Sequence, residues 1–342
     1  MRIGILTGGG DCPGLNPVIR AVVRTSIQNG DEVLGIRNGW LGLVDNLPVK
    51  PLNLETVSGI LHRGGTILGT SRTNPYKEKN SLKTLKETWT NIGLDALIAV
   101  GGEDTLGVAT KLSAEGFPVV GVPKTIDNDL SGTDYTFGFD TAINIVMEAI
   151  DRLHTTAESH HRIMVVEVMG RHAGWIALHA GLAGGADIII IPEFAVTIDQ
   201  VIETIKRRQA RGKNFSIVVV AEGAHIKGQK LVEKSKKKDS FGHTLLGGIS
   251  HQLAQEIEKK TGFETRVTEL GHIQRGGSPT AFDRVLGTRF GVKAVELVKQ
   301  RKFGYMVALR GTEIEAVRIK EATSNLKVVN KEFYELAQKF FG

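Results

Sequence analysis

Short apolar runs alternate with longer amphipathic stretches along most of this chain. The runs that predict strands are Arg2–Thr7, Val33–Ile36, Ala96–Val100, Val119–Val122, Ile163–Val168, Ile188–Ile191 and Ile217–Ala221. The stretches that predict helices are Leu15–Gln28, Leu106–Glu115, Thr141–Thr156, Ala173–Ala183, Ile198–Arg211, Leu245–Lys260, Ala281–Lys299 and Lys331–Phe341. Apolar strands joined by helices predict mainly parallel sheets in a doubly wound α/β fold.

Polar, glycine-rich segments follow many of these strands. They are Gly8–Asn16, Gly101–Thr105, Pro123–Asp129, Met169–Ala173, Glu222–Ala224 and Gly271–Pro279. Ligands of open α/β sheets bind at the carboxyl ends of the strands. The placement of these segments therefore predicts a ligand site at the strand ends.

Composition narrows the class of protein. A length of 342 residues predicts two domains, and one cysteine points to a reducing cytoplasm. No apolar run is long enough for a bilayer span and no signal peptide is evident, so we expect a cytoplasmic protein without membrane partners. The formal net charge of +6 favours anionic partners. The lysine-rich stretch Lys227–Lys238 has almost no aromatic residues, which favours a solvated loop over a nucleic-acid surface.

The turn Gly8–Asn16, GGGDCPGLN, lies between a predicted strand and a predicted helix. Backbone N–H groups and a helix N-terminus in this arrangement can bind an anion. The turn lacks the third glycine of the dinucleotide fingerprint, and the chain has no Walker A motif. A purely structural tight turn explains the glycines equally well.

The segment Gly101–Thr105, GGEDT, brings Glu103 and Asp104 to a strand end. Two carboxylates beside a phosphate would repel it unless a cation lies between them, and Mg²⁺ is the hard cation that fits this role. Acidic residues are also common at helix N-termini, so a structural explanation carries equal weight.

The segment Pro123–Asp129, PKTIDND, combines a cation with two carboxylates. Phosphoryl transfer needs a base for the attacking hydroxyl and positive charge on the moving group. Asp127 can be the base, Lys124 the cation, and Asp129 a metal-linked acid. An Asx-rich turn is the structural alternative.

Seven motifs together resemble the series found in the 6-phosphofructokinases. They are GGGDCPGLN, SRTNP, GGEDT, PKTIDND, MGRHAGW, AEGA and GHIQRGGSP, in that order, and the resemblance extends from residue 1 to about residue 300. It implies two Rossmann-like three-layer αβα domains with the active site in the cleft between them. The phosphoryl-donor domain would be 1–138 plus 274–324, and the sugar-phosphate domain 139–273 plus 325–342. It also implies a homodimer or homotetramer and Mg²⁺ as cofactor.

The resemblance assigns roles to individual residues. Gly10 and Arg72 would bind the donor, Glu103 would be the magnesium-linked acid, and Asp127 would accept the proton of the sugar 1-hydroxyl. The residues implied to bind fructose 6-phosphate are Thr125, Asp127, Arg162, Met169, Gly170, Arg171, Glu222, Arg266, His272 and Arg275. Of these, Arg171 is also counted as catalytic, and Arg162 and Arg266 would reach the site from a neighbouring subunit. Guanidinium groups suit such a role because their forks match phosphate oxygens.

Two residues bear on the phosphoryl donor. Most ATP-using members of the family carry glycine where this chain has Asp104 and Lys124. A carboxylate ~4 Å from the ATP α-phosphate would cost about 4 kcal/mol at an effective dielectric constant near 20. Asp104 would thus exclude ATP, and Lys124 would stabilise the group transferred from pyrophosphate. We therefore expect reversible phosphoryl transfer from pyrophosphate to fructose 6-phosphate.

The sequence is compatible with other functions as well. An ATP-dependent 6-phosphofructokinase is the main rival, and a non-catalytic phosphate sensor and a dehydrogenase are weaker ones. Sedoheptulose 7-phosphate stays open as a second acceptor. Ala21 and Thr25 replace basic residues of regulated relatives, so we expect weak or absent control by ADP or phosphoenolpyruvate. Cys12 and Trp175 are expected to be packing residues.

Overall fold

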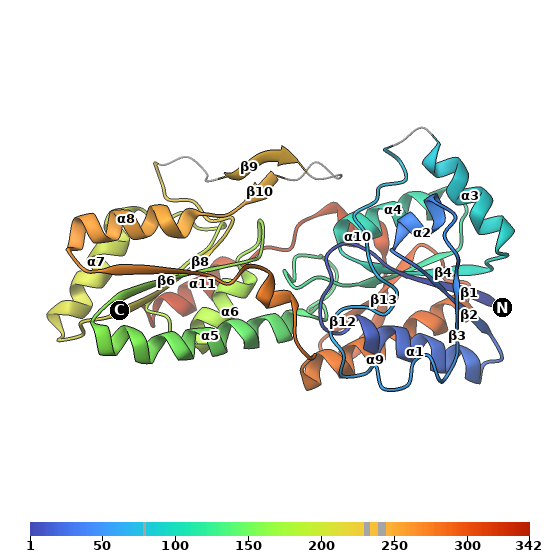
Figure 1. Ribbon diagram of the computed structural model, residues 1–342, viewed down its shortest axis with the longest axis horizontal. Helices are drawn as coiled ribbons and strands as arrows, with labels where there is room; N and C mark the ends of the chain where they lie inside the picture. Colours follow the sequence, from blue (N-terminus) through green and yellow to red (C-terminus); the bar gives the residue numbers. More distant parts are fainter. Residues whose placement is uncertain (78–79, 229–232, 239–243) are drawn as a thin grey trace. The chain divides into compact units, whose positions relative to one another are not determined.

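The computed structural model describes residues 1–77, 80–228, 233–238 and 244–342. Two compact units make up the chain (Figure 1). The first unit comprises Met1–Ile126, Leu130–Thr141 and Arg275–Leu326. The second unit comprises Asp127–Asp129, Ala142–Gln274 and Lys327–Gly342.

A seven-stranded sheet forms the centre of the first unit, with the order β13-β12-β5-β4-β1-β2-β3. Its strands are β1 (Arg2–Thr7), β2 (Glu32–Ile36), β3 (Lys50–Leu52), β4 (Ala96–Gly101), β5 (Val119–Pro123), β12 (Tyr305–Arg310) and β13 (Glu313–Arg318). The five inner strands pair in parallel, and β3 and β13 are antiparallel edges. Every residue of β4 and β5 is buried, as expected for strands covered on both faces.

Helices cover both faces of this sheet. α1 (Leu15–Gln28) and α9 (Ala281–Lys299) pack together on one face, and α4 (Glu103–Ala114) and α10 (Ile319–Ser324) lie on the other (Figure 1). Two further helices of this unit are α2 (Trp40–Val44) and α3 (Ser81–Asn91). The helices cover the faces of the sheet, so the turns that connect strands to helices lie at the carboxyl ends of the inner strands.

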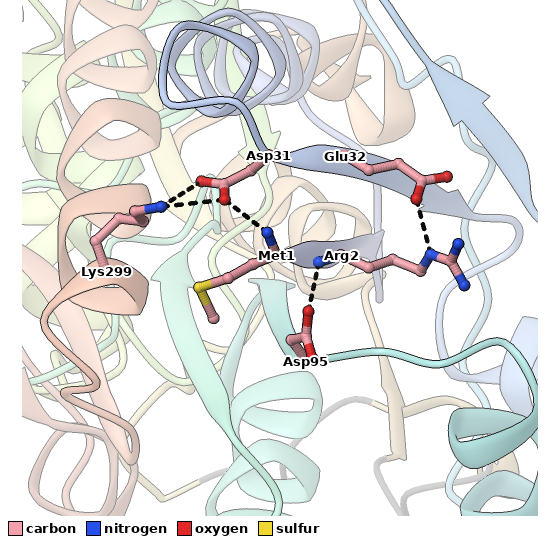
Figure 2. Close-up of polar contacts among 6 residues, drawn as sticks. All are labelled: Met1, Arg2, Asp31, Glu32, Asp95 and Lys299. Atoms are coloured by element: carbon pink, nitrogen blue, oxygen red, sulfur yellow. Dashed lines mark hydrogen bonds and ion pairs between the residues drawn. The ribbon is translucent and has the colours of Figure 1, made fainter.

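A polar network closes the amino-terminal edge of the same sheet (Figure 2). The carboxylate of Asp31, whose side chain is 2% exposed, accepts hydrogen bonds from Lys299 Nζ at 2.9 and 3.0 Å and from the Met1 amino group at 2.8 Å. Arg2 Nε donates to Glu32 Oε2 at 2.8 Å on the exposed side. These contacts tie β1, β2 and α9 together at the edge opposite the strand-end turns.

The second unit has a four-stranded, wholly parallel sheet with the order β11-β6-β8-β7. The strands are β6 (Ile163–Val168), β7 (Ile188–Ile190), β8 (Ser216–Ala221) and β11 (Thr265–Glu269). α7 (Ile198–Ala210) and α8 (Ile249–Thr261) lie on one face, and α5 (Phe139–His160) and α6 (Trp175–Ala183) on the other (Figure 1). An antiparallel ribbon of β9 (Glu233–Lys238) and β10 (Thr244–Leu246) and the helix α11 (Lys331–Gln338) complete the unit.

The predicted parallel α/β architecture is confirmed, with two local errors. Leu245 and Leu246, predicted as the start of a helix, belong to β10, and the helix begins only at Ile249. Within the lysine-rich stretch, residues 233–238 form a strand and not a loop, because they pair with β10. Residues 229–232 and the side chains of 229–245 lie outside the described residues. The elements that the pattern did not predict are β3, β9, β10, β11, β12, β13, α2, α3 and α10.

Candidate functional site

Three neighbouring parallel strands of the first unit end together. β1, β4 and β5 are adjacent, with Thr7 level with Val100 and Gly101 level with Pro123. Gly8 N donates to Val100 O at 2.9 Å, and Lys124 N donates to Gly101 O at 3.0 Å. The turns that follow these strands are therefore held side by side by backbone hydrogen bonds.

Two cations surround Gly10 in the first of these turns. The ammonium of Lys124, a residue that is only 3% exposed, donates to the Gly10 carbonyl. Arg275 Nη1 donates to the Asp11 carbonyl at 3.3 Å. A Cβ atom at Gly10 would lie 2.5 Å from Arg275 Nη1, so a larger residue would require this guanidinium group to move. Positive charge thus lies along the turn that was predicted to bind an anion.

The first turn of α4 carries the two acids predicted from GGEDT. Glu103 is exposed and Asp104 is half-buried, and both belong to the first turn of the helix. Acidic side chains are favourable at a helix N-terminus, so this position stabilises α4 whatever its other role. Gly101 is required for the packing here, because a Cβ atom would lie 2.3 Å from Thr105 Cβ.

The backbone bends at the start of the segment Asp127–Asp129 of the second unit. Asp127 is 5% exposed, and Asn128 adopts φ 52°, a left-handed conformation that asparagine tolerates better than most residues. Asp129 accepts a hydrogen bond on its carbonyl oxygen from Lys327 N at 2.9 Å. This segment fixes Asp127 as a buried carboxylate.

The motifs MGR and AEGA meet through backbone contacts in the second unit. Arg171 has φ 51°, and its N–H donates to Glu222 Oε1 at 3.1 Å. A Cβ atom at Gly223 would lie 1.7 Å from the Arg171 carbonyl oxygen, so no other residue fits there. The left-handed backbone conformation of Arg171 is strained for a residue other than glycine, and such strain concentrates at functional sites. The structure thereby brings Gly170, Arg171 and Glu222 together.

The pKa of Glu222 is raised from 4.5 to about 7, chiefly by burial and next by the negative charge of Asp127. Backbone hydrogen bonds from Arg171 and Gly170 act in the opposite direction without offsetting the burial. The two carboxylates are close enough to influence each other, and the proton affinity of Glu222 is tuned to neutral pH. Perturbed carboxyl groups of this kind are typical of functional sites.

Gln274 is a residue that the sequence did not single out. It is 0% exposed, accepts from Met169 N at 3.2 Å through Oε1, and donates to Gly271 O at 3.1 Å through Nε2. It therefore holds the turn after β6 against the 3₁₀ helix Gly271–Arg275. Its position inside the predicted motif GHIQRGGSP was the only available signal. Exposed His272 is carried on the same short helix.

Arg162 and Arg266 lie at the opposite, amino-terminal end of the second sheet. Arg162 precedes β6, and Arg266 is the second residue of β11. Both contact one carboxylate, that of Glu264, which accepts from Arg162 Nε at 2.6 Å and from Arg162 Nη2 at 3.0 Å. β6 has six residues, which at ~3.3 Å per residue puts Arg162 about 20 Å along the strand from the turn at Met169.

The predicted site residues therefore fall into separate groups. The first unit holds Gly10, Arg72, Glu103, Asp104, Lys124, Thr125 and Arg275. The second unit holds Asp127 and Asp129 in its short segment Asp127–Asp129. It also holds Met169, Gly170, Arg171, Glu222 and His272 after the carboxyl ends of its strands, with Arg162 and Arg266 at the amino ends. Arg275, predicted to hold the sugar 6-phosphate, contacts the Gly10 turn of the first unit.

The two predicted packing residues behave as expected. Cys12 is fully buried, and its burial raises the pKa of the thiol to about 12 despite the nearby Lys124 and Arg275. Trp175 begins α6 and donates from Nε1 to the Lys327 carbonyl at 2.9 Å. Neither is placed as a nucleophile.

The part of the chain that the structure describes contains neither a cluster of metal ligands nor a membrane-spanning helix. Among residues 1–77, 80–228, 233–238 and 244–342, no three His, Cys, Asp or Glu side chains gather as a metal cage. Over those same residues, no helix has both the length and the apolar character that crossing a membrane requires.

The family model, the related sequences and the related structures all indicate the same protein family. Residues 2–298 match the model of the family described as phosphofructokinase. Over 343 residues the chain is 60% identical to the pyrophosphate–fructose 6-phosphate 1-phosphotransferase of Amycolatopsis methanolica, covering 100% of each chain. It is 52% identical to ATP-dependent 6-phosphofructokinase 3 of Streptomyces coelicolor, covering 99% of each. Among solved structures, a phosphofructokinase from Saccharomyces cerevisiae matches with a TM-score of 0.81 and 33% identity, over 99% of this chain and 46% of that one.

Proposed function

Because the chain belongs to the phosphofructokinase family, as its motifs predicted, we propose that it transfers a phosphoryl group from pyrophosphate to the 1-hydroxyl of fructose 6-phosphate. The products are phosphate and fructose 1,6-bisphosphate, and the reaction runs in both directions. The observation that carries the choice of donor is the buried ammonium of Lys124 at the Gly10 carbonyl, next to the α4 turn that bears Asp104.

Lys124 and Asp104 act on the donor in different ways. The Lys124 ammonium lies at the strand ends that would receive a small polyanion, and it stabilises charge on the transferred group. Asp104 places a carboxylate where the nucleotide portion of ATP would lie, which disfavours ATP but not pyrophosphate. Gly10 and Arg72 bind the donor phosphates. The 60% identity to a relative named for pyrophosphate supports this assignment.

Asp127 is the base that accepts the proton of the attacking hydroxyl. Its burial keeps competing water away, and its neighbour Glu222 binds a sugar hydroxyl. Thr125, Met169, Gly170 and Arg171 contact the sugar phosphate, and His272 and Arg275 hold its 6-phosphate. The strained backbone at Arg171 supports a functional role for this turn.

Mg²⁺ would be held by Glu103 and Asp129 together with phosphate oxygens of the donor. Each carboxylate by itself suits such an ion, because Mg²⁺ commonly uses one or two carboxylates and keeps several waters, with no need for a protein cage. When bound, the ion neutralises charge on the transferring phosphates.

The protein acts as a homodimer or homotetramer in the cytoplasm. The arginines Arg162 and Arg266 support this, because they lie about 20 Å along β6 from the Met169 turn of their own chain. In a second copy they can complete the 6-phosphate site. Nucleic acid and membranes are not partners in this proposal.

The second candidate is an ATP-dependent 6-phosphofructokinase, which is favoured by the 52% identity to a relative of that name. Steady-state rates of the purified protein with pyrophosphate and with ATP, each with Mg²⁺ and fructose 6-phosphate, separate the two. We expect turnover with pyrophosphate and little with ATP. Brisk turnover with ATP and none with pyrophosphate would reject the proposal.

A further inference from the structure

Arg162 and Arg266 share one carboxylate, that of Glu264. Glu264 Oε2 accepts from Arg162 Nε at 2.6 Å, and Oε1 accepts from Arg162 Nη2 at 3.0 Å and from Arg266 Nη2. Arg266 also donates from Nη1 to the Thr265 carbonyl at 3.3 Å. Both guanidinium groups are therefore tied to the same short segment.

The backbone fixes this arrangement. Thr265 of β11 is level with Ile163 of β6, and Ile163 N donates to the Glu264 carbonyl at 3.1 Å. Glu264 thus lies directly opposite Arg162 across the strand pair, although the two are far apart in sequence. Cross-strand neighbours of opposite charge stabilise each other modestly, by about 0.2–1 kcal/mol. So small a stabilising effect does not by itself account for a carboxylate shared between two arginines.

The geometry of the Arg162 pair suggests another role. Glu264 occupies the side of the guanidinium formed by Nε and Nη2. Each guanidinium has five N–H donors, so the end formed by Nη1 and Nη2 keeps donors for a second anion. A phosphate is recognised by such a fork, and its recognition depends on the orientation of the plane.

We propose that Glu264 is a positioning residue that orients Arg162 and Arg266 to receive the 6-phosphate of a sugar bound by a second copy of this chain. This inference rests on the proposed function, since it takes those arginines as phosphate ligands. Glu264 reduces the rotamer freedom of two long side chains before the substrate arrives, and part of the entropy cost of binding is removed. Its net effect on affinity is favourable even though its own charge repels phosphate.

Kinetics of Glu264→Gln test the proposal. We expect KM for fructose 6-phosphate to rise by about tenfold or more, with kcat changed by less than about threefold and KM for pyrophosphate unchanged. Glu264→Asp keeps the charge on a shorter stem and should restore part of the loss. Glu258→Gln is the matched control, because it makes the same charge change at an exposed position on α8 of the same unit.

A double-mutant cycle checks that Glu264 acts through the two arginines. In a background that carries both Arg162→Ala and Arg266→Ala, Glu264→Gln should change KM by less than about twofold. Additive effects, an unchanged KM, or a lower KM from relief of repulsion would each overturn the proposal. Loss of the assembled state of Glu264→Gln by light scattering would also overturn it, since the role would then be structural.

Different outcomes would contradict the role of Glu264 and the proposed function. If the wild-type protein converts fructose 6-phosphate but Glu264→Gln behaves like Glu258→Gln, only the role of Glu264 is wrong. If the wild-type protein does not convert fructose 6-phosphate with either donor, the proposed function itself is wrong.

Discussion

The ammonium group of Lys124 donates a hydrogen bond to the carbonyl oxygen of Gly10, so a buried cation lies inside the turn that follows β1. The contact joins the carboxyl ends of β5 and β1, on either side of β4. A lysine this deeply buried is costly unless a partner of opposite charge compensates it. Under the proposed function, pyrophosphate would interact with this ammonium group.

Replacing Lys124 by methionine keeps the length of the side chain and removes the charge. We expect kcat with pyrophosphate to fall at least a hundredfold, because loss of one preorganised charge contact in a transition state costs about 3–4 kcal/mol. Rates at saturating fructose 6-phosphate measure this. Lys206→Met, at an exposed position of α7, is the control. A loss of less than tenfold would mean that Lys124 has a structural role only.

Replacing Asp104 by glycine should admit ATP. Removing a like charge ~4 Å from the α-phosphate lowers the free energy of ATP binding by up to about 4 kcal/mol at an effective dielectric constant near 20, roughly a thousandfold in kcat/KM. Asp104→Asn separates the two causes, because it removes the charge and keeps the bulk. We expect Asn to recover part of the gain. If neither variant uses ATP better than the wild type, Asp104 does not select the donor.

The contacts of Asp31 with Met1 and Lys299 lead to a prediction about the stability of the fold, not about catalysis (Figure 2). Burial of Asp31 would raise the pKa of its carboxyl, but hydrogen bonds from the Met1 amino group and Lys299 outweigh it, and the pKa is lowered from 3.8. The resulting stabilisation is present above pH 3.8 and is lost as the pH falls below it. Asp31→Asn should reduce the free energy of unfolding at pH 7 by about 2 kcal/mol, measured by urea unfolding at fixed protein concentration.

The neighbouring residue provides the control for Asp31. Glu32 pairs with Arg2 at 2.8 Å, but the two side chains are 50% and 43% exposed. Exposed pairs contribute about 0–1 kcal/mol, so Glu32→Gln should have a small effect. Equal losses for the two variants would contradict the importance of burial here.

The elements that the sequence predicted well are those with continuous apolar runs. β1, β4, β6 and β8 are almost wholly buried, so burial on both faces leaves a clear pattern. The edge strand β13, EIEAVR, alternates charged and apolar residues and runs directly into α10, so it has no continuous apolar run. β9 reads EKSKKK and has no apolar face at all. Its pairing with β10 is a tertiary effect that local pattern cannot reveal.

The sequence predicted those parts of the candidate site that lie in recognisable motifs directly after buried strands. The Gly10 turn, Lys124 and the Arg171–Glu222 contact follow from segments placed after buried strands. Glu264 and Gln274 could not be found in this way, because their partners are Arg162 and Met169, and only the pairing and packing of β6 and its neighbours bring them together. The tuned pKa of Glu222 likewise depends on burial, which a linear motif does not contain.

That tuned pKa leads to a pH-dependent prediction for Glu222→Gln. The pKa of Glu222 is raised from 4.5 to about 7, first by burial, so the folded state binds its proton more tightly than the unfolded state. The stabilisation from the protonated form is fully present below pH 4.5 and is lost as the pH rises through about 7. Glutamine stays neutral at every pH. The variant should therefore gain up to about 3 kcal/mol in free energy of unfolding over the wild type at pH 8.5, and almost nothing at pH 4.5.

Urea unfolding of both proteins at the two pH values, at one protein concentration, measures this difference. Glu258→Gln, at an exposed position, should show no such dependence on pH. Glu222→Gln should also raise KM for fructose 6-phosphate, because a neutral amide is a weaker acceptor for a sugar hydroxyl than a carboxylate. Gained stability with lost substrate affinity is the trade-off expected of a strained or desolvated functional residue. A gain of equal size at both pH values would mean that packing, and not the buried charge, accounts for it.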